Sequence, residues 1–453
     1  MVGIGGIGMS SIAEVLLLRG YTITGSDMAQ SDVTKHLEEI GATIYVGHEG
    51  SQAAGAHVVV YSSAVNVDHN PETQYAIEHH IPVIRRSEML GELMRMKFGV
   101  GIAGTHGKTT TTTMAGHVIS AGDFDPTIIV GGKVSAFGSN AVSGAGDIIL
   151  IEADEYDRTF LRLTPSLAVI TNIDADHLDC YRDLDDITDA FVQYASSVPF
   201  FGAAIVCLDN DNVRSILDRI DRRVITYGTV EGAQVRAVRI AQQGQTMFFD
   251  VEQEGVLLGR IELAVPGTHN VLNALAAIAV GLELDMTFEV ISSGISSFKG
   301  VQRRMETIAD ANGILVVDDY AHHPTEVMAT LQGAAGAWPD RRIIAVFQPH
   351  LYSRTIDLCS EFGGAFFDAD VVVIMDVYGA REQPLPGVSG ALIAREAEAL
   401  GHPQVKYVPE KADLVDHVVR MSHPGDVIIT MGAGDIWRLN RQIAAQIQEE
   451  VYG

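Results

Sequence analysis

Short runs of apolar residues alternate with longer amphipathic stretches along almost the whole chain. The runs are rich in Val and Ile and are hydrophobic at successive positions rather than at every second one. Continuous hydrophobicity of this kind is typical of parallel strands that are covered by helices on both faces. We therefore predict an α/β fold made of several doubly wound units, with strands within residues 56–65, 97–104, 147–154, 166–173, 203–208, 313–320, 341–348, 370–377 and 426–434.

The pattern also suggests how the chain divides. The first segment opens with a glycine-rich loop, the second with a strand before another such loop, and the third with a new strand. We expect boundaries that give segments 1–89, 90–300 and 301–453. Within the second segment, residues 228–265 no longer show the alternation of apolar runs and amphipathic stretches, and they contain turn glycines. This predicts antiparallel hairpins that extend a sheet edge.

Composition narrows the possible partners. The chain carries 58 acidic against 31 basic residues, a formal charge of −27, which opposes binding to nucleic acid or to an anionic membrane surface. No apolar stretch approaches the roughly 18 residues that would span a bilayer. Three cysteines lie far apart and lack metal-site spacing, which fits a reducing compartment. We expect a cytoplasmic protein that binds neither nucleic acid nor membrane.

Residues 101–118 read GIAGTHGKTTTTTMAGHV, which is the strand–loop–helix order of a phosphate-binding loop. Glycines let backbone N–H groups converge on phosphate oxygens, and the helix N-terminus and Lys108 add positive charge. Thr109, with Thr110 beside it, supplies a hydroxyl suited to Mg²⁺. The loop is shorter than the GxxxxGK[ST] pattern because residue 102 is Ile. Thr111–Thr113 have no assigned role at this stage.

A second glycine loop, GIGGIG at 3–8, is followed nineteen residues later by Asp27. This spacing is that of a dinucleotide site, although a structural turn without a ligand gives the same pattern. Only Met1 and Val2 precede the loop, so we expect the first strand to be truncated.

Further polar residues follow predicted strands. Glu152 and His177 lie just beyond two of them, where they could hold a hard cation near a triphosphate, although His177 alone would also suit a structural role. His269 and Asn270 stand at the start of an apolar helix, and Asn270 could be a simple N-cap. The paired arginines of KGVQRRME suit phosphate contacts. Polar clusters at 318–326 and 347–355 follow what we take to be two neighbouring strands and predict a ligand face.

These residues together resemble the Mur ligases of peptidoglycan synthesis. The motifs GIGGIGMS, GTHGKTT, EADE, the histidine of DADHLD, GTHN, RRME, DDYAHHPTE and FQPHLYSRT occur in the family's order, from residue 3 to about residue 355. The resemblance implies three domains: a Rossmann-like domain that binds a UDP-sugar, a central P-loop ATPase-type parallel sheet, and a Rossmann-like C-terminal domain that presents an amino acid. It also implies that the first glycine loop binds UDP rather than NAD.

The implied reaction is ATP-dependent ligation of L-alanine to the carboxylate of UDP-N-acetylmuramate through an acyl phosphate, in a monomer or homodimer. The resemblance implies catalytic roles for Lys108, His177 and Arg304, and Mg²⁺ ligands in Thr109, Glu152 and His177. ATP would contact Gly104, Thr105, His106, Gly107, Lys108, Thr109, Thr110, His269, Asn270, Arg304 and Asp319. The other substrates would contact Gly3, Gly5, Gly6, Ile7, Gly8, Asp27, Tyr320, His322, His350 and Arg354.

Two departures bear on this expectation. Leu351 stands where the family commonly has arginine, so one positive contact near the substrate is absent. Position 192 is Val, and no lysine lies between 134 and 298, so the carbamoylated lysine of members that add later amino acids is missing. This favours the member that adds L-alanine. The alternatives are a member that attaches a whole tripeptide to the same nucleotide sugar, an NAD-dependent oxidoreductase, and a non-catalytic nucleotide-binding protein.

Overall fold

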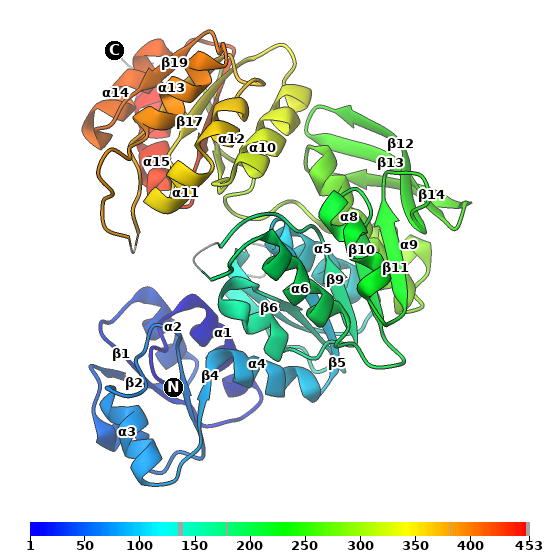
Figure 1. Ribbon diagram of the computed structural model, residues 1–453, viewed down its shortest axis with the longest axis vertical. Helices are drawn as coiled ribbons and strands as arrows, with labels where there is room; N and C mark the ends of the chain where they lie inside the picture. Colours follow the sequence, from blue (N-terminus) through cyan, green and yellow to red (C-terminus); the bar gives the residue numbers. More distant parts are fainter. Residues whose placement is uncertain (135–138, 178–179, 381, 450–453) are drawn as a thin grey trace. The chain divides into compact units, whose positions relative to one another are not determined.

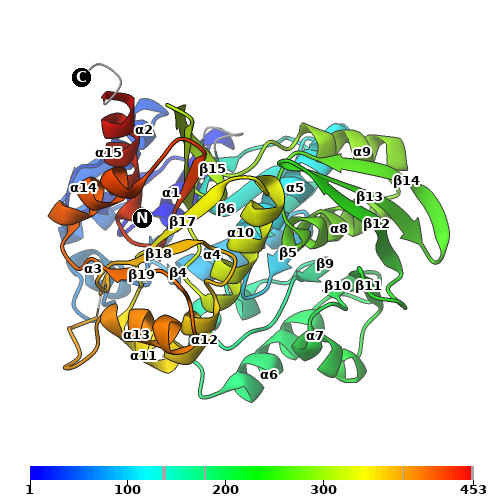
Figure 2. The same ribbon diagram turned by 90° about the horizontal axis from the view of Figure 1, so that it is seen from above.

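The computed structural model describes residues 1–134, 139–177, 180–380 and 382–449. The chain forms two compact units (Figures 1 and 2). The first comprises Met1–Arg239, Phe249–Ile261 and Leu272–Phe298, and the second comprises Ile240–Phe248, Glu262–Val271 and Lys299–Gly453. The predicted α/β class is confirmed, because parallel strands alternate with helices in both units.

The N-terminal part of the first unit is a small parallel sheet. Strands β1 and β2 pair in parallel, as do β3 and β4, and Val2 forms parallel bridges to both Ser26 and Tyr61. The order is thus β2-β1-Val2-β3-β4, the strand order of a Rossmann unit in which Val2 alone represents the first strand. The elements are α1 (Ile7–Leu18), β1 (Thr24–Asp27), α2 (Asp32–Glu39), β2 (Thr43–Val46), η1 (Gly50–Ala53), β3 (Val59–Tyr61), α3 (Pro71–Glu78), β4 (Val83–Arg85) and α4 (Arg86–Arg95).

A ten-stranded sheet in the order β14-β13-β12-β11-β10-β9-β5-β8-β6-β7 dominates the rest of this unit. Its strands are β5 (Phe98–Ala103), β6 (Thr127–Val134), β7 (Ser139–Val142), β8 (Ile148–Glu152), β9 (Leu167–Ile170), β10 (Ala203–Cys207), β11 (Val224–Gly228), β12 (Val235–Gln243), β13 (Thr246–Gln253) and β14 (Val256–Leu263). Its helices are α5 (Lys108–Ala121), η2 (Tyr156–Arg162), α6 (Leu184–Ala195), α7 (Asp211–Ser215), η3 (Leu217–Arg219), α8 (Thr268–Glu283) and α9 (Phe288–Ser297).

The continuous apolar sequence of its central strands explains why this sheet is buried. The residues of β5, β8, β9 and β10 are buried almost without exception, as strands with continuous apolar sequence must be when helices cover both faces. Helix α5 packs on β5, β6 and β8 and on α9, while α6 packs beside β9 (Figure 2). The hairpins predicted within 228–265 are β12, β13 and β14, which extend one edge of the sheet. The expected boundary at 89/90 falls inside α4.

The second unit contains a six-stranded sheet in the order β15-β16-β20-β17-β18-β19, with β15 antiparallel to β16. The expectation that the strands before the two polar clusters are neighbours is wrong, because β20 pairs in parallel with both and lies between them. The elements are β15 (Glu306–Ala311), β16 (Ile314–Asp319), α10 (Pro324–Ala337), β17 (Arg342–Phe347), α11 (Tyr352–Asp357), α12 (Cys359–Gly364), β18 (Val371–Ile374), α13 (Ala391–Ala399), β19 (Val405–Tyr407), α14 (Lys411–Met421), β20 (Asp426–Met431) and α15 (Ile436–Glu449).

Within the described part of the chain, every helix is too short or too polar to cross a membrane.

Candidate active site

The predicted phosphate loop connects β5 to α5, and its two glycines hold conformations that other residues rarely adopt. Gly104 has φ 137° and Gly107 has φ 80°. A Cβ on Gly104 would collide with the Thr171 hydroxyl, and one on Gly107 would lie 2.5 Å from Asn273 Oδ1. The loop is further fixed by Asn172, whose Oδ1 accepts a 2.8 Å hydrogen bond from the His106 N–H. Backbone and neighbours together therefore require glycine at both positions.

Lys108 begins α5 and lies in a buried ion pair that the sequence motif does not reveal. Its Nζ donates to the carbonyl oxygens of Gly104 and Thr105 at 2.8 and 3.2 Å, and to Glu155 Oε1 at 2.8 Å. Burial alone would lower the pKa of Lys108, but the charges of Glu155, Asp154 and Glu152 together outweigh burial and raise that pKa to about 12. The lysine is therefore a permanent cation held at the mouth of the loop.

Glu155 is the residue that sequence reasoning missed. It lies just after β8, is 2% exposed, and contacts both Lys108 and the Nε2 of His177, the latter at 3.3 Å. Burial would raise the pKa of Glu155, but Lys108 and His177 outweigh burial and hold it below its ordinary value. The same contact, with Asp176, raises the pKa of His177 against the effect of burial. Its place as the last residue of EADE was the signal that could have indicated it.

Four of the five threonines near the start of α5 divide into two groups. Thr109 donates its hydroxyl to Glu152, as described below, whereas Thr111, Thr112 and Thr113 are fully buried. The Thr111 hydroxyl donates to Asn273 Oδ1 at 3.1 Å, and the Thr113 hydroxyl donates to the Thr109 carbonyl at 2.8 Å. Short branched side chains fill the closely packed space around α5 without burying an unpaired charge. Thr111, Thr112 and Thr113 therefore serve packing.

Thr109 and Glu152 form a donor set that fits Mg²⁺. The Thr109 hydroxyl lies 2.9 Å from Glu152 Oε1, and Glu152 Oε2 accepts the Gly131 N–H at 2.7 Å. Two oxygens on adjacent corners of an octahedron with bonds of about 2.1 Å lie about 3 Å apart, so this pair matches the geometry that Mg²⁺ demands. Burial raises the pKa of Glu152, against the effects of Gly131, Lys108 and Thr109. A bound cation would relieve that desolvation cost.

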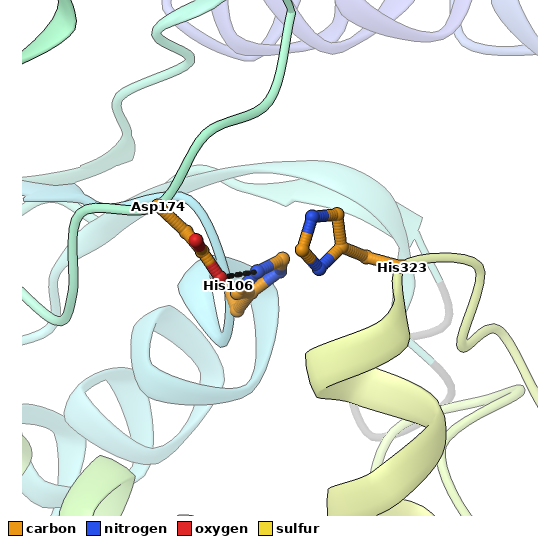
Figure 3. Close-up of side chains that lie close together, drawn as sticks. All are labelled: His106, Asp174 and His323. Atoms are coloured by element: carbon orange, nitrogen blue, oxygen red, sulfur yellow. Dashed lines mark hydrogen bonds and ion pairs between the residues drawn. The ribbon is translucent and has the colours of Figure 1, made fainter. Parts of the chain in front are cut away.

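His106 points from the loop toward the segment after β9. Its Nε2 lies 3.4 Å from Asp174 Oδ2 (Figure 3). The Asp174 N–H also donates to the Thr105 hydroxyl at 2.9 Å, which ties this segment to the loop. His323, drawn in the same figure, belongs to the second unit, where its Nδ1 accepts the Thr325 N–H at the start of α10.

The first glycine loop borders a cavity of about 670 Å³ at the carboxyl ends of the N-terminal strands. Asp27 is one lining residue, and its Oδ2 accepts the Gly5 N–H at 2.8 Å. This carboxylate therefore supports the loop in addition to facing the cavity. Ile7 and Gly8 begin α1, so the loop leads into a helix as a phosphate-binding turn does. Other lining residues are Gly3, Gly6, His48, Ser62 and Asn66.

In the second unit, the two polar clusters meet although their strands are not neighbours. The rings of His322 and His350 lie 5.9 Å apart, and Tyr320 packs edge-on against His322 at 5.2 Å. Arg354, which is 8% exposed, lies with its Nη1 3.4 Å from His350 Nδ1. Asp319 ends β16, and burial raises its pKa to about 6. The tip of the sheet thus gathers Tyr320, His322, His350 and Arg354 at one place, next to Asp319.

The two arginines of RRME have different surroundings. Arg303 donates Nε to Asp318 at 3.0 Å and Nη2 to the Gly432 carbonyl at 2.6 Å, which joins the segment before β15 to β16 and to the residue after β20. Both arginines lie over the Tyr320 ring, Arg303 at 4.9 Å and Arg304 at 5.3 Å, but the ion pair of Arg304 is with Glu326, at 3.7 Å. Arg303 is therefore tied into the sheet, whereas ligand binding by Arg304 stays a prediction.

His269 and Asn270 lie in the first turn of α8. The interpretation of Asn270 as an N-cap is wrong: it is the third helical residue, and its amide donates to the Pro266 carbonyl at 2.7 Å, whereas a cap accepts from the backbone. Burial, with a smaller effect of Arg304, lowers the pKa of His269 to about 4, so this imidazole is neutral.

The fold and these sites define a multidomain nucleotide-binding enzyme, and comparison with known families identifies which. Three family models match in order: the Mur ligase family catalytic domain over residues 1–98, the Mur ligase middle domain over 102–281, and the Mur ligase glutamate ligase domain over 303–434. The chain belongs to the Mur ligase family.

Individual relatives match this chain along nearly its full length. The chain is 60% identical over 450 residues to the UDP-N-acetylmuramate–L-alanine ligase of Salinibacter ruber, with 99% of this chain and 95% of the relative covered. It is 49% identical to the enzyme of that name from Geotalea daltonii, with 99% of this chain and 97% of the relative covered. Among solved structures, the UDP-N-acetylmuramate–alanine ligase MurC of Thermotoga maritima matches with a TM-score of 0.80 at 28% identity, covering 99% and 98%. A murein peptide ligase of Psychrobacter arcticus matches with a TM-score of 0.69 at 25% identity, covering 99% and 98%.

Proposed function

We propose that this protein joins L-alanine to the carboxylate of UDP-N-acetylmuramate at the expense of ATP, in peptidoglycan precursor synthesis. The observation that carries this proposal is the full-length likeness, at 60% identity, to a UDP-N-acetylmuramate–L-alanine ligase. The phosphate loop with Lys108, and the Thr109–Glu152 pair, supply the parts that ATP chemistry needs. ATP, the nucleotide sugar and L-alanine are all water-soluble, which supports a cytoplasmic reaction.

The chemistry explains why ATP is required. A carboxylate is a poor electrophile, so its oxygen first attacks the γ-phosphorus of ATP, the bond to the β-phosphate oxygen breaks, and ADP leaves. The amine nitrogen of alanine then attacks the acyl carbon of the acyl phosphate, inorganic phosphate leaves, and the amine loses a proton. Charge accumulates on phosphate oxygens throughout, so a fixed cation and converging N–H groups lower the barrier.

Residues of this chain take these roles as follows. Lys108 and the N–H groups of the loop would stabilise charge on the β- and γ-phosphates. Thr109 and Glu152 would hold one Mg²⁺, and Glu152 with His177 a second; these ions supply charge neutralisation when bound. Glu155 keeps Lys108 and His177 in place through its buried carboxylate. Asp319, His269, Asn270 and Arg304 remain our candidates for nucleotide contacts, and the cluster of Tyr320, His322, His350 and Arg354 for the muramoyl and alanine groups.

The direct test is phosphate release from ATP and Mg²⁺ with UDP-N-acetylmuramate, with and without L-alanine, followed by mass spectrometry of the sugar nucleotide. We expect a product heavier by one alanine residue, formed only when all components are present. A parallel reaction with the tripeptide as acceptor decides between this activity and that of the murein peptide ligases. Ligation of the tripeptide in preference to L-alanine would replace our assignment by the second one.

The different surroundings of Arg303 and Arg304 give a paired prediction. Arg304→Ala should lower turnover by about a hundredfold, as the loss of one group that stabilises transition-state charge typically does, and leave UDP-sugar binding and thermal stability unchanged. Arg303→Ala removes the bonds to Asp318 and Gly432, so it should lower the free energy of unfolding by about 2 kcal/mol. Steady-state kinetics and denaturant unfolding of both variants check this. Equal effects of the two substitutions on stability would contradict the division of roles.

A further inference from the structure

His106 lies in the middle of the phosphate loop, and three hydrogen bonds fix its backbone. Its N–H donates to Asn172 Oδ1 at 2.8 Å, and its carbonyl accepts from the Thr171 hydroxyl at 2.7 Å and from Asn172 Nδ2 at 3.1 Å. The backbone N–H groups of such a loop bind phosphate by pointing at it, whereas this one points at a side-chain oxygen of the protein. What His106 contributes to the site is therefore its imidazole ring.

Asp174 sets the orientation of that ring (Figure 3). The His106 side chain is only 12% exposed, and its Nε2 lies 3.4 Å from Asp174 Oδ2. The aspartate is itself held in place, because its Oδ1 accepts the Ala175 N–H at 2.9 Å and its own N–H donates to the Thr105 hydroxyl at 2.9 Å. A carboxylate can only accept a hydrogen bond, so Nε2 carries the hydrogen and the neutral ring has its lone pair on Nδ1.

The proposed reaction needs a group that accepts a proton. The amine of an amino acid is mostly protonated at neutral pH, and only the neutral amine can attack an acyl carbon. Several side chains around the loop have other tasks: Lys108 is a permanent cation, and Glu155 is paired with both Lys108 and His177. Glu152 accepts from Thr109 and is a candidate metal ligand. A histidine that a carboxylate orients is a common general base in acyl transfer.

We propose that His106, oriented by Asp174, is the general base of the second half-reaction. This inference rests on the proposed function, which supplies the acyl phosphate and the amine. Nδ1 of His106 accepts the proton that turns the ammonium group of L-alanine into the attacking amine, and Asp174 stabilises the imidazolium that results. As the nitrogen bonds to the acyl carbon, the bond from that carbon to the phosphate oxygen breaks, and the departing phosphate takes a second proton from the nitrogen. The phosphoryl group is the one that the loop bound as γ-phosphate, so the acyl phosphate forms beside this ring.

Hydroxylamine tests this in the full chain, because its nitrogen is neutral at neutral pH and attacks an acyl phosphate without a general base to give a hydroxamate. With ATP, Mg²⁺ and UDP-N-acetylmuramate present, His106→Gln should ligate L-alanine about a hundredfold more slowly and form hydroxamate within about twofold of the parent rate. Asp174→Asn should show the same split, since an amide can donate to Nε2 and reverse the tautomer. His57→Gln, at an exposed position, is the matched control and should change neither rate.

A second measurement needs no amine: ADP formed in a single turnover without L-alanine, followed by rapid quenching, reports the first half-reaction and should be unchanged in His106→Gln. Thermal unfolding shows that each variant is folded. Failure of the unaltered protein to ligate L-alanine would overturn the proposed function. If the unaltered protein is active, near-normal ligation of L-alanine by His106→Gln would overturn only this inference. Equal losses of L-alanine ligation and of ADP formation would also overturn it, because the ring would then serve phosphoryl transfer.

Discussion

Lys108→Met is expected to lower ligation by about a hundred- to a thousandfold, because it removes the full positive charge that Lys108 places at the phosphate loop while keeping an unbranched side chain of similar length. The rate of phosphate release with all substrates present measures this effect. Lys35→Met, at an exposed position of α2, is a control for the loss of a lysine and should leave turnover unchanged. A Lys108→Met variant that retained near-normal turnover would contradict the proposed role of this lysine.

The buried ion pair complicates the interpretation of this variant, and the structure indicates how to resolve it. Without Lys108, the buried Glu155 keeps only His177 as a charged partner, so the variant should also be less stable. Adding Glu155→Gln removes the unpaired charge, and the double variant should regain much of the lost stability without regaining turnover. Recovery of both properties together would mean that Lys108 acts through folding rather than through phosphate charge.

The second large effect is expected at Glu152. Glu152→Gln keeps the shape of the side chain and removes one oxygen ligand and its charge, so the Mg²⁺ concentration for half-maximal turnover should rise by about ten- to a hundredfold. Direct titration of Mn²⁺, as a probe ion, into the protein with ADP should show a loss of affinity of the same order. This measurement separates metal binding from catalysis.

The stability of the Glu152→Gln variant should stay close to that of the parent chain. Burial already disfavours the charged form of this carboxyl, since it raises the pKa of Glu152, and a neutral amide avoids that cost. Glu92→Gln, at an exposed position of α4, is the matched control and should change neither metal titration. Identical Mg²⁺ titrations for Glu152→Gln and the control would count against Glu152 as a ligand.

The sequence by itself determined the buried central strands, such as β5, β8, β9, β10, β16, β17 and β20, and the position of the phosphate loop. These features depend on local chemistry: continuous apolar runs must be buried on both faces, and a glycine loop between strand and helix gathers N–H groups wherever it occurs. The same local reasoning put Glu152 just beyond a strand end, and the family resemblance joined it to Lys108 and Thr109; the pairing of β5 with β8 then brings the two strand ends side by side.

Only the tertiary structure decided which distant groups meet. The insertion of β20 between β16 and β17 depends on pairing between segments about a hundred residues apart, which no local pattern specifies. The same holds for Glu155 against Lys108, for the threonines that pack against Asn273, and for the choice of Arg303 rather than Arg304 as the structural arginine. His106 shows this most clearly, because its orientation depends on Asn172 and Asp174, which lie 66 and 68 residues further along the chain and meet the phosphate loop only in the fold.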